Sequence, residues 1–356
     1  MKKILAVSLS GIGNTILFTP FLRSLRRHFP EARIDLLTWS RAMAAPVEGS
    51  ALADNLIVMG DRPAARCSTV WRLRRARYDA SVLAFPSNGL LFHALSFALG
   101  ARRRYAHRYA GFRLRTLGFL ETETVPAVEG LHDVDQNMTL LSLFGVPPAG
   151  EERVLTFHLG AGDQDFAERW IREKRITARP LIGLHPGAGG ALADWQGSAK
   201  RWPIEPFIEL SRRLVEEMNA TVLVFGGPDE DVLKERTVCS SPKPGRTVAV
   251  NESLKHTAAL IRACDLMISN DSGLMHVAAA LGVPTLGIFG PTNPSRTAPR
   301  GPRCRFLHKP AAAAPLLRYP FHSTSSKIPR HAGLKAFDGI GVEEVWSLAQ
   351  QMLASR

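Results

Sequence analysis

Residues 266–284 read LMISNDSGLMHVAAALGVP, the pattern of a buried strand that leads directly into a helix. The apolar run ends at Ser269, the three alanines at 278–280 allow a helix to pack closely, and Gly282 is the residue type that ends a helix. Strands and helices that alternate in this way build parallel sheets. The stretch therefore predicts an α/β fold.

The turn between this strand and this helix carries groups that suit a phosphate. Asp271 or Ser272 can cap the helix, and Gly273 lets a ligand approach the first turn, where free N–H groups and the helix dipole favour an anion. His276 follows in the same helix. Open parallel sheets bind ligands at the carboxyl ends of their strands, so we predict a phosphate site here. The alternative is that Asp271 and Ser272 are only cap residues.

The rest of the chain repeats this alternation in two halves. We predict strands at 3–9, 33–39, 55–59, 80–85, 181–185, 221–225, 247–250 and 285–289, and helices at 165–174, 206–218 and 254–263. Residues 19–29 also have helical spacing, with Pro20 suited to a first turn. Because 356 residues exceed one ordinary core, we predict two Rossmann-like domains, 1–165 and 175–340. A terminal helix at 342–353 can pack back on the first domain.

Three further turns of the second half carry groups that suit a nucleotide sugar. Gly187, in the sequence HPGAG, allows close approach of a substrate to the backbone. Lys200 can neutralise a diphosphate, and Asp229 and Glu230 can accept hydrogen bonds from ribose hydroxyls. Each has a simpler alternative, since glycines make turns, lysines lie on surfaces and acidic residues favour turns.

In the first half, residues 8–15 read SLSGIGNT and join the first strand to the first helix. The third glycine of the dinucleotide motif GxGxxG is missing, which disfavours a nicotinamide enzyme. Ser10, Gly11 and Gly13 lie in this loop, which we expect to face the strand ends of the second domain across a cleft. The loop can therefore carry acceptor-binding or catalytic groups.

The composition limits the classes of partner. A net charge of +13 favours anionic partners, and arginine clusters such as Arg102, Arg103 and Arg104 suit phosphate or lipid headgroups, with a solvated surface as the alternative. No nucleic acid is expected, because no reader motif accompanies the charge. Four dispersed cysteines favour a reducing cytoplasm, and no stretch reaches the roughly 20 apolar residues of a membrane span. We expect a cytoplasmic protein whose contact with the inner-membrane surface is peripheral.

Taken together, these motifs resemble the heptosyltransferases of glycosyltransferase family nine. The resemblance is carried by GIGN at 11–14, HPGA at 185–188, KRWP at 200–203, FGG at 225–227 and NDSG at 270–273 with His276. It implies a GT-B fold, two Rossmann-like domains with an interdomain cleft. It also implies inverting, metal-independent transfer from a nucleotide sugar, usually ADP-heptose, to the core of lipopolysaccharide, with no cofactor besides that substrate.

The resemblance also implies roles for individual residues. Lys200, Asp271, Ser272 and Gly273 match the positions that hold the donor phosphate and sugar. The acidic turn at Asp229 and Glu230 matches the position beside the nucleoside, and His276 lies in the same helix turn as the donor site. Ser10, Gly11, Gly13 and Gly187 complete the predicted donor contacts. With an acidic glycolipid implied as acceptor, we assign Arg102, Arg103 and Arg104 to its phosphates.

Position 14 departs from the family pattern. The family has an aspartate there as general base, whereas this chain has Asn14, and an amide cannot take the acceptor's proton. We still assign Asn14, Lys200 and Asp271 to the catalytic centre. Another group can serve, the acceptor can already be ionised, or activity can be lost. Substitutes for the base are His132, Asp133 and Asp135, although a plain solvated turn is favoured for each of them.

Two other functions stay open from the sequence. A catalytically silent homologue that binds a sugar nucleotide or a glycolipid is supported only by Asn14. A sugar-nucleotide epimerase would also have twin Rossmann-like domains.

Overall fold

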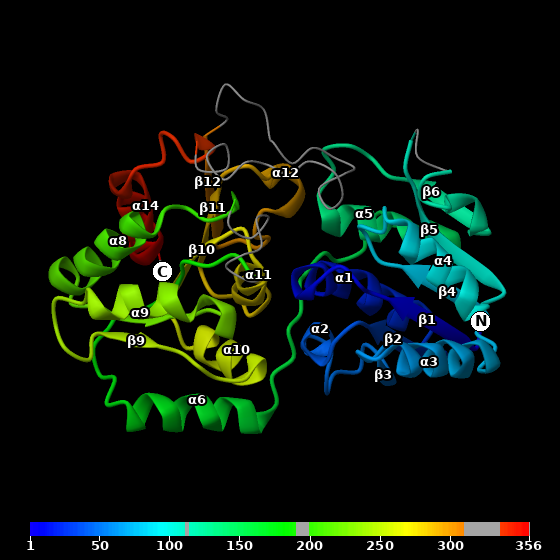
Figure 1. The fold of residues 1–356 in the computed structure, drawn as a ribbon, viewed down its shortest axis with the longest axis horizontal. Coiled ribbons are helices and arrows are strands. Elements are labelled where there is room, and N and C mark those ends of the chain that lie inside the picture. Colours follow the sequence, from blue (N-terminus) through cyan, green and yellow to red (C-terminus); the bar gives the residue numbers. More distant parts are fainter. Residues whose placement is uncertain (111–113, 190–198, 310–334, 356) are drawn as a thin grey trace. The chain divides into compact units, whose positions relative to one another are not determined.

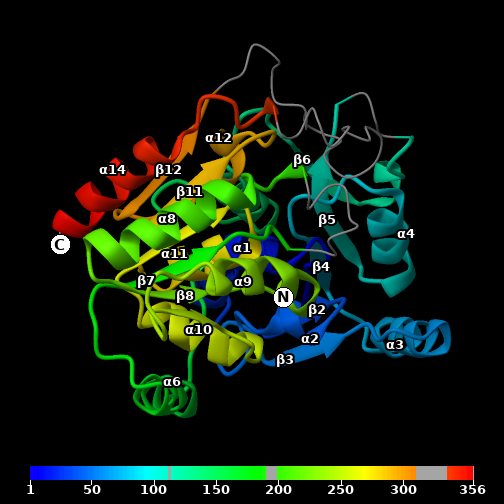
Figure 2. The ribbon, with the colours of Figure 1, turned by 60° about the vertical axis from the view of Figure 1, so that its left-hand side comes forward.

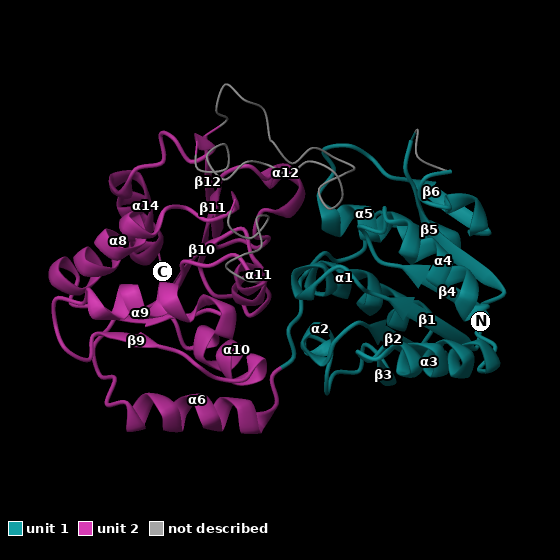
Figure 3. Ribbon diagram, in the orientation of Figure 1, with its two compact units in different colours: residues 1–158, 319–324 teal, residues 159–318, 325–356 magenta. Residues whose placement is uncertain are grey.

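A computed structural model describes residues 1–110, 114–189, 199–309 and 335–355. The chain forms two compact units. Unit 1 begins at Met1 and ends at His158, and unit 2 contains the described residues from Leu159 onward (Figure 3). No helix in these described ranges has the length and apolar character needed to cross a membrane.

Unit 1 is built on a six-stranded parallel sheet in the order β3-β2-β1-β4-β5-β6 (Figure 1). Its strands are β1 (Lys3–Val7), β2 (Arg33–Thr38), β3 (Asn55–Val58), β4 (Ala80–Leu83), β5 (Arg103–Arg108) and β6 (Glu123–Pro126). Its helices are α1 (Ile12–His28), α2 (Arg41–Ala44), α3 (Pro63–Arg75), α4 (Leu90–Leu99) and α5 (Asp133–Thr139), with 3-10 turns η1 (Gly118–Leu120) and η2 (Leu140–Phe144). All the paired strands are parallel, so their carboxyl ends meet at one edge.

Helix α1 starts well before the predicted position. The sequence suggested a start near Pro20, but the helix begins at Ile12 and contains Pro20 in its interior. A proline cannot donate to the carbonyl four residues earlier, which here is that of Ile16. The hydroxyl of Thr19 donates to this carbonyl at 2.7 Å. Thr19 thus supplies the missing donor, and the helix extends back to Ile12, so that Asn14 lies in its first turn.

Unit 2 has a second six-stranded parallel sheet, in the order β12-β11-β10-β7-β8-β9. Its strands are β7 (Leu181–His185), β8 (Thr221–Val224), β9 (Thr247–Ala249), β10 (Leu266–Asn270), β11 (Thr285–Phe289) and β12 (Cys304–His308). Its helices are α6 (Ala161–Glu173), α8 (Ile204–Glu217), α9 (Asp231–Cys239), α10 (Leu254–Arg262), α11 (Gly273–Ala280), α12 (Pro294–Thr297) and α14 (Val342–Ala354), with the 3-10 turn η3 (Pro228–Glu230). Both sheets have the doubly wound pattern that the sequence predicted.

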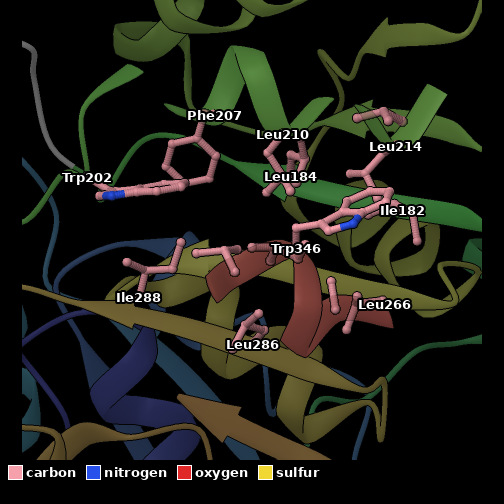
Figure 4. Close-up of a cluster of buried hydrophobic side chains, with 14 of the residues drawn as sticks. Ile182, Leu184, Trp202, Phe207, Leu210, Leu214, Leu266, Leu286, Ile288 and Trp346 are labelled. Atoms are coloured by element: carbon pink, nitrogen blue, oxygen red, sulfur yellow. The ribbon is translucent and has the colours of Figure 1, made fainter. Parts of the chain in front are cut away.

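The terminal helix α14 packs on unit 2, so the suggestion that it returns to the first domain is corrected. Val345 and Trp346 are buried in the hydrophobic core of unit 2 with Leu210 and Leu214 of α8 (Figure 4). Figure 2 shows α14 lying beside α8. The physical reason is the apolar face of α14, which completes the cover of this side of the sheet.

Trp202 belongs to the same core and holds the chain in front of α8. Its indole N–H donates to the carbonyl of Ile340 at 3.1 Å, and its ring meets that of Phe207 edge to face. This anchor fixes the backbone that carries Lys200 to the core of unit 2.

Candidate active site

In unit 2, Lys200 and Asp271 form an ion pair at the carboxyl edge of the sheet. The ammonium of Lys200 lies 3.2 Å from Oδ2 of Asp271, which directly follows β10. Burial opposes ionisation of Asp271, but the charges of Lys200 and His276 and hydrogen bonds from Lys200 and Thr292 outweigh it and hold the pKa of Asp271 below its ordinary range. Asp271 is therefore an anion with its cation beside it. Lys200 is partly exposed, so a ligand can reach it.

The first turn of α11 lies directly after this carboxylate. Of the two predicted caps, Ser272 is the one that acts: its hydroxyl accepts from the backbone N–H of Met275 at 3.3 Å. Ser272 is also 2.9 Å from Nδ1 of His185, at the end of β7. The N–H groups of Gly273 and Leu274 have no acceptor within the helix, because they belong to its first turn. The turn thus presents donors and a positive dipole end to an anion.

Glu230 holds the glycine-rich loop that follows β7. Its Oε1 accepts from the backbone N–H groups of Ala188 at 2.9 Å and Gly189 at 3.0 Å. Its Oε2 accepts from the N–H of Gly227 at 3.1 Å and lies 3.0 Å from Nε2 of His185. The structure therefore gives Glu230 a role in positioning the loop, and its contact with ribose stays a prediction. Asp229, in the same turn, is exposed.

The ionised carboxylate of Glu230 makes the stability of unit 2 decrease at acidic pH. Burial would raise its pKa, but hydrogen bonds from His185, the charge of His185 and the N–H groups of Gly227 and Gly189 outweigh this and hold the pKa at about 2, below the ordinary 4.5. A depressed pKa stabilises the fold above the unfolded value, and this stabilisation is lost as the pH falls from about 4.5 toward 2. The shift corresponds to at most about 3 kcal/mol.

The variant Glu230→Gln tests this dependence, because glutamine does not titrate. We expect the urea midpoint of the wild-type chain to fall more between pH 7 and pH 3 than that of Glu230→Gln, while the two midpoints differ most at pH 7. Parallel acid dependence in the two proteins would show that Glu230 has no such role.

Asn270 joins three parts of the site. Its Oδ1 accepts from the backbone N–H of Trp202 at 3.0 Å. Its Nδ2 donates to the carbonyls of Pro186 and Gly187, both at 3.0 Å. One buried amide thus fixes the end of β10, the glycine-rich loop and the segment after Lys200. The sequence placed Asn270 in the motif without this role, and it did not single out His185 either.

The loop of unit 1 that contains Asn14 lies at the carboxyl edge of its own sheet. Nδ2 of Asn14 donates to the carbonyl of Ser10 at 3.0 Å, and the hydroxyl of Ser10 donates to the carbonyl of Pro86 at 2.8 Å. Gly11, at φ 131°, has a backbone conformation that side chains rarely adopt, and Gly13 lies in the first turn of α1. A carboxylate at position 14 could not donate to Ser10, because it has acceptors only. This loop is therefore built around an amide.

The three proposed substitutes for the base differ in position. Asp135 forms an ion pair with Arg153 at 2.7 Å, and His132 caps α5, accepting from the N–H of Val134. Asp133 is buried, so it does not belong to a solvated turn.

Helix α5 packs along α1 in the same direction. Asn137 of α5 donates to the carbonyl of Leu17 at 3.4 Å, and Phe144, further along the chain, meets the ring of Phe21. Asp133, one turn before Asn137, is buried, and its carbonyl accepts from Nδ2 of Asn137 at 2.9 Å.

The sheet register shows where Arg102, Arg103 and Arg104 lie, and their assignment to the acceptor stays a prediction. Arg103 is level with Ala80, which in turn is level with Ile4 near the start of β1. These arginines therefore lie at the amino edge of the sheet, roughly 15 Å of strand from the loop that contains Asn14. The sequence identified the arginine cluster but did not predict that strand β5 begins within it. Arg108, at the other end of β5, is the exposed arginine of this strand on the carboxyl edge.

No three histidine, cysteine, aspartate or glutamate side chains in the described ranges are placed together as metal ligands would be. The four cysteines, all described, are free.

Comparisons with known sequences identify one family. The sequence profile of glycosyltransferase family 9 (heptosyltransferase) matches residues 66–320. Lipopolysaccharide heptosyltransferase 2 of Escherichia coli (strain K12) is 27% identical over 322 residues, covering 86% of this chain and 87% of that protein. The protein of the same name from Salmonella typhimurium is 29% identical over 323 residues, covering 86% and 87%.

Solved structures show the same fold. The E. coli ADP-heptose lps heptosyltransferase II gives a TM-score of 0.74 at 21% identity and covers 100% of this chain and 99% of that one. A family 9 glycosyl transferase from Veillonella parvula gives 0.79 at 22% identity, covering 100% and 98%. An E. coli heptosyltransferase with ADP-2-deoxy-2-fluoro heptose gives 0.67 at 17% identity, covering 98% and 99%. The fold is therefore GT-B, as the sequence predicted.

Proposed function

The chain belongs to glycosyltransferase family 9, the heptosyltransferases, and is a glycosyltransferase; from this premise we propose that it transfers heptose from ADP-heptose to the core of a lipopolysaccharide. Relatives named as lipopolysaccharide heptosyltransferases along most of the chain support the acceptor class. The structural neighbour with ADP-2-deoxy-2-fluoro heptose supports the donor. A silent homologue is not favoured by these relatives.

The observation that carries the proposal is the Lys200–Asp271 pair beside the first turn of α11. A departing nucleoside diphosphate gains negative charge, which an ammonium and open N–H groups stabilise. Lys200 and the N–H of Gly273 can stabilise this negative charge, and ionised Asp271 orients the ammonium of Lys200 at 3.2 Å. The cationic side chain and the helix dipole can do the work of a divalent metal, so we propose a metal-independent transfer.

The acceptor hydroxyl attacks the anomeric carbon as the diphosphate leaves from the opposite side, which inverts the configuration. Its proton needs an acceptor other than Asn14, because an amide is not a base. We propose Asp133, a buried carboxylate at the start of α5, for this role, and propose that Asn14 orients the loop through its bond to Ser10.

Substitutions at the two positions separate these roles. Asn14→Ala should lower kcat by less than about a hundredfold, because only an orienting contact is lost. Asp133→Asn should lower kcat by about 10²–10⁴-fold, the usual cost of removing a general base. Single-turnover transfer measured against pH is the readout, since Asp133→Asn should also remove the acid limb. The reverse order of effects would make Asn14 the more important residue and reject Asp133.

Binding of the donor can be tested without any acceptor. Isothermal titration with ADP-, UDP-, GDP- and dTDP-sugars should show the tightest binding for ADP-heptose, unchanged by a chelator. Preference for another nucleotide would reject ADP-heptose, and loss of binding on chelation would reject metal independence. We place the reaction in the cytoplasm, which the four free cysteines support.

A further inference from the structure

Helix α4 of unit 1 exposes large apolar side chains and buries two polar ones. Its sequence, LLFHALSFAL, contains no charged residue. Leu90, Leu91 and Phe97 are 50%, 72% and 49% exposed. His93 and Ser96, by contrast, are completely buried. A helix on the surface of a protein in water normally has the opposite arrangement.

The buried polar side chains explain how α4 stays attached in this orientation. Nδ1 of His93 lies 2.8 Å from Oε1 of Glu121, and the hydroxyl of Ser96 donates to Oε2 at 3.0 Å. Glu121 follows η1, so the helix is bound to its neighbour by polar contacts. Leu99 is buried and Phe92 and Leu95 pack against the core of unit 1, whereas other apolar side chains of α4 stay exposed.

Neighbouring elements extend the apolar surface. Phe119, on η1 beside α4, is 47% exposed, and Trp71 is 60% exposed on α3, which packs against α4. The buried residues of α3 are Thr69 and Leu73, so Trp71 lies on the opposite side of that helix. We call this set the α4 surface: Trp71, Leu90, Leu91, Phe97 and Phe119. Contiguous exposed apolar patches of this kind mark interaction sites.

Arginines border the α4 surface directly. The guanidinium of Arg75 lies over the ring of Trp71 at 4.3 Å, and that of Arg104 lies over Phe97 at 5.5 Å. Arg74 donates to the carbonyl of Ala98 at 3.1 Å. The sequence from 62 to 120 contains twelve arginines and a single carboxylate, Asp79. The exposed apolar side chains therefore have the guanidinium groups of Arg74, Arg75 and Arg104 at their border, in a segment with a large surplus of positive charge.

We propose that the α4 surface docks on an anionic lipid bilayer, with its leucine and phenylalanine side chains at the acyl boundary and the surrounding arginines on headgroup phosphates. Exposed aliphatic and aromatic side chains with flanking cations are the composition of interfacial helices. A protein surface with a surplus of arginine is attracted to anionic lipid more strongly than an average protein surface is. Arg104, one of the arginines assigned to the acceptor from the sequence, borders this surface through its contact with Phe97. The proposal goes beyond the proposed function and does not depend on it.

Flotation of the full-length chain with vesicles tests the proposal. Vesicles of equal parts phosphatidylcholine and phosphatidylglycerol should bind the wild-type protein at low salt, and vesicles of phosphatidylcholine alone should bind it much less. Leu91→Ser and Leu91→Glu should each lower the partition coefficient at least about tenfold, because each removes an apolar side chain that becomes buried in the bilayer. Val154→Ser and Val154→Glu are the matched controls, since Val154 is 61% exposed in the same unit outside the α4 surface.

Several results would overturn the proposal. These are failure of the wild-type chain to float with anionic vesicles, equal partitioning of the Leu91 variants and wild type, or an equal loss in the Val154 variants. Circular dichroism establishes that each variant is folded, and Leu91→Ser keeps the test valid if Leu91→Glu is not. A dimer in sedimentation velocity that Leu91→Glu dissociates, without vesicle binding, would assign the surface to a second copy of the chain instead. Because no sugar nucleotide is present, the outcome is independent of the donor site.

Discussion

Replacing Lys200 with alanine should lower kcat/KM by at least about 10²–10³-fold, the usual cost of removing one group that stabilises developing negative charge. The ammonium lies 3.2 Å from Asp271, in front of the first turn of α11. Its loss removes the cation for the leaving diphosphate. It also leaves the buried carboxylate of Asp271 without its main partner, so the pKa of Asp271 should rise toward or above its ordinary value.

The measurement is initial-rate transfer from the nucleotide sugar, with donor affinity from titration. Arg236→Ala is the control: it also removes the cation of an ion pair in unit 2, with Glu205, but that pair is exposed. We expect near-wild-type rates for Arg236→Ala, since exposed ion pairs contribute little. Turnover of Lys200→Ala at the wild-type rate would remove Lys200 from the donor site.

The second large effect is expected for Gly187→Ala. A Cβ at this position would lie 1.9 Å from Oε1 and 2.2 Å from Cδ of Glu230, so the carboxylate must move. It would then lose its hydrogen bonds from the loop after β7, and a buried charge would lose its partners. Overpacking and a broken buried network each cost several kcal/mol, so we expect at least about 3 kcal/mol of destabilisation and a large loss of donor affinity.

Gly227→Ala is the matched control, because no atom lies within 4 Å of its Cβ position and its φ of −71° suits alanine. Urea unfolding and donor titration should separate the two variants clearly. Similar stability and affinity in both would show that the close approach of Gly187 to Glu230 has no consequence.

The sequence predicted most of the unit 2 sheet, because its central strands are short apolar runs between turn residues. The bounds of β7 and β11 agree with the prediction, and β10 is one residue longer. The sequence did not identify β5, which reads RRYAHR and so has an arginine at half of its positions. Edge strands and arginine-rich strands lack the apolar pattern on which such predictions depend.

The site was predicted unevenly for a physical reason. Lys200 and Asp271 were assigned to one site, and the structure pairs them. Which side chains hold the backbone in place depends on contacts between distant segments, as when Asn270 joins Trp202 to Gly187. Such contacts leave no local signal in the sequence. The start of α1 was missed for a similar reason, because the hydrogen bond from Thr19 to the carbonyl of Ile16 exists only in the folded helix.

Transfer of heptose from ADP-heptose through the Lys200–Asp271 site can be measured directly. The test incubates the purified chain with ADP-heptose and a lipopolysaccharide core acceptor that lacks heptose, and follows the mass of the acceptor. We expect a gain of one heptose with stoichiometric release of ADP, lost in Lys200→Ala and kept in Arg236→Ala. An acceptor of unchanged mass with the wild-type chain, or the same gain with Lys200→Ala, would contradict this assignment.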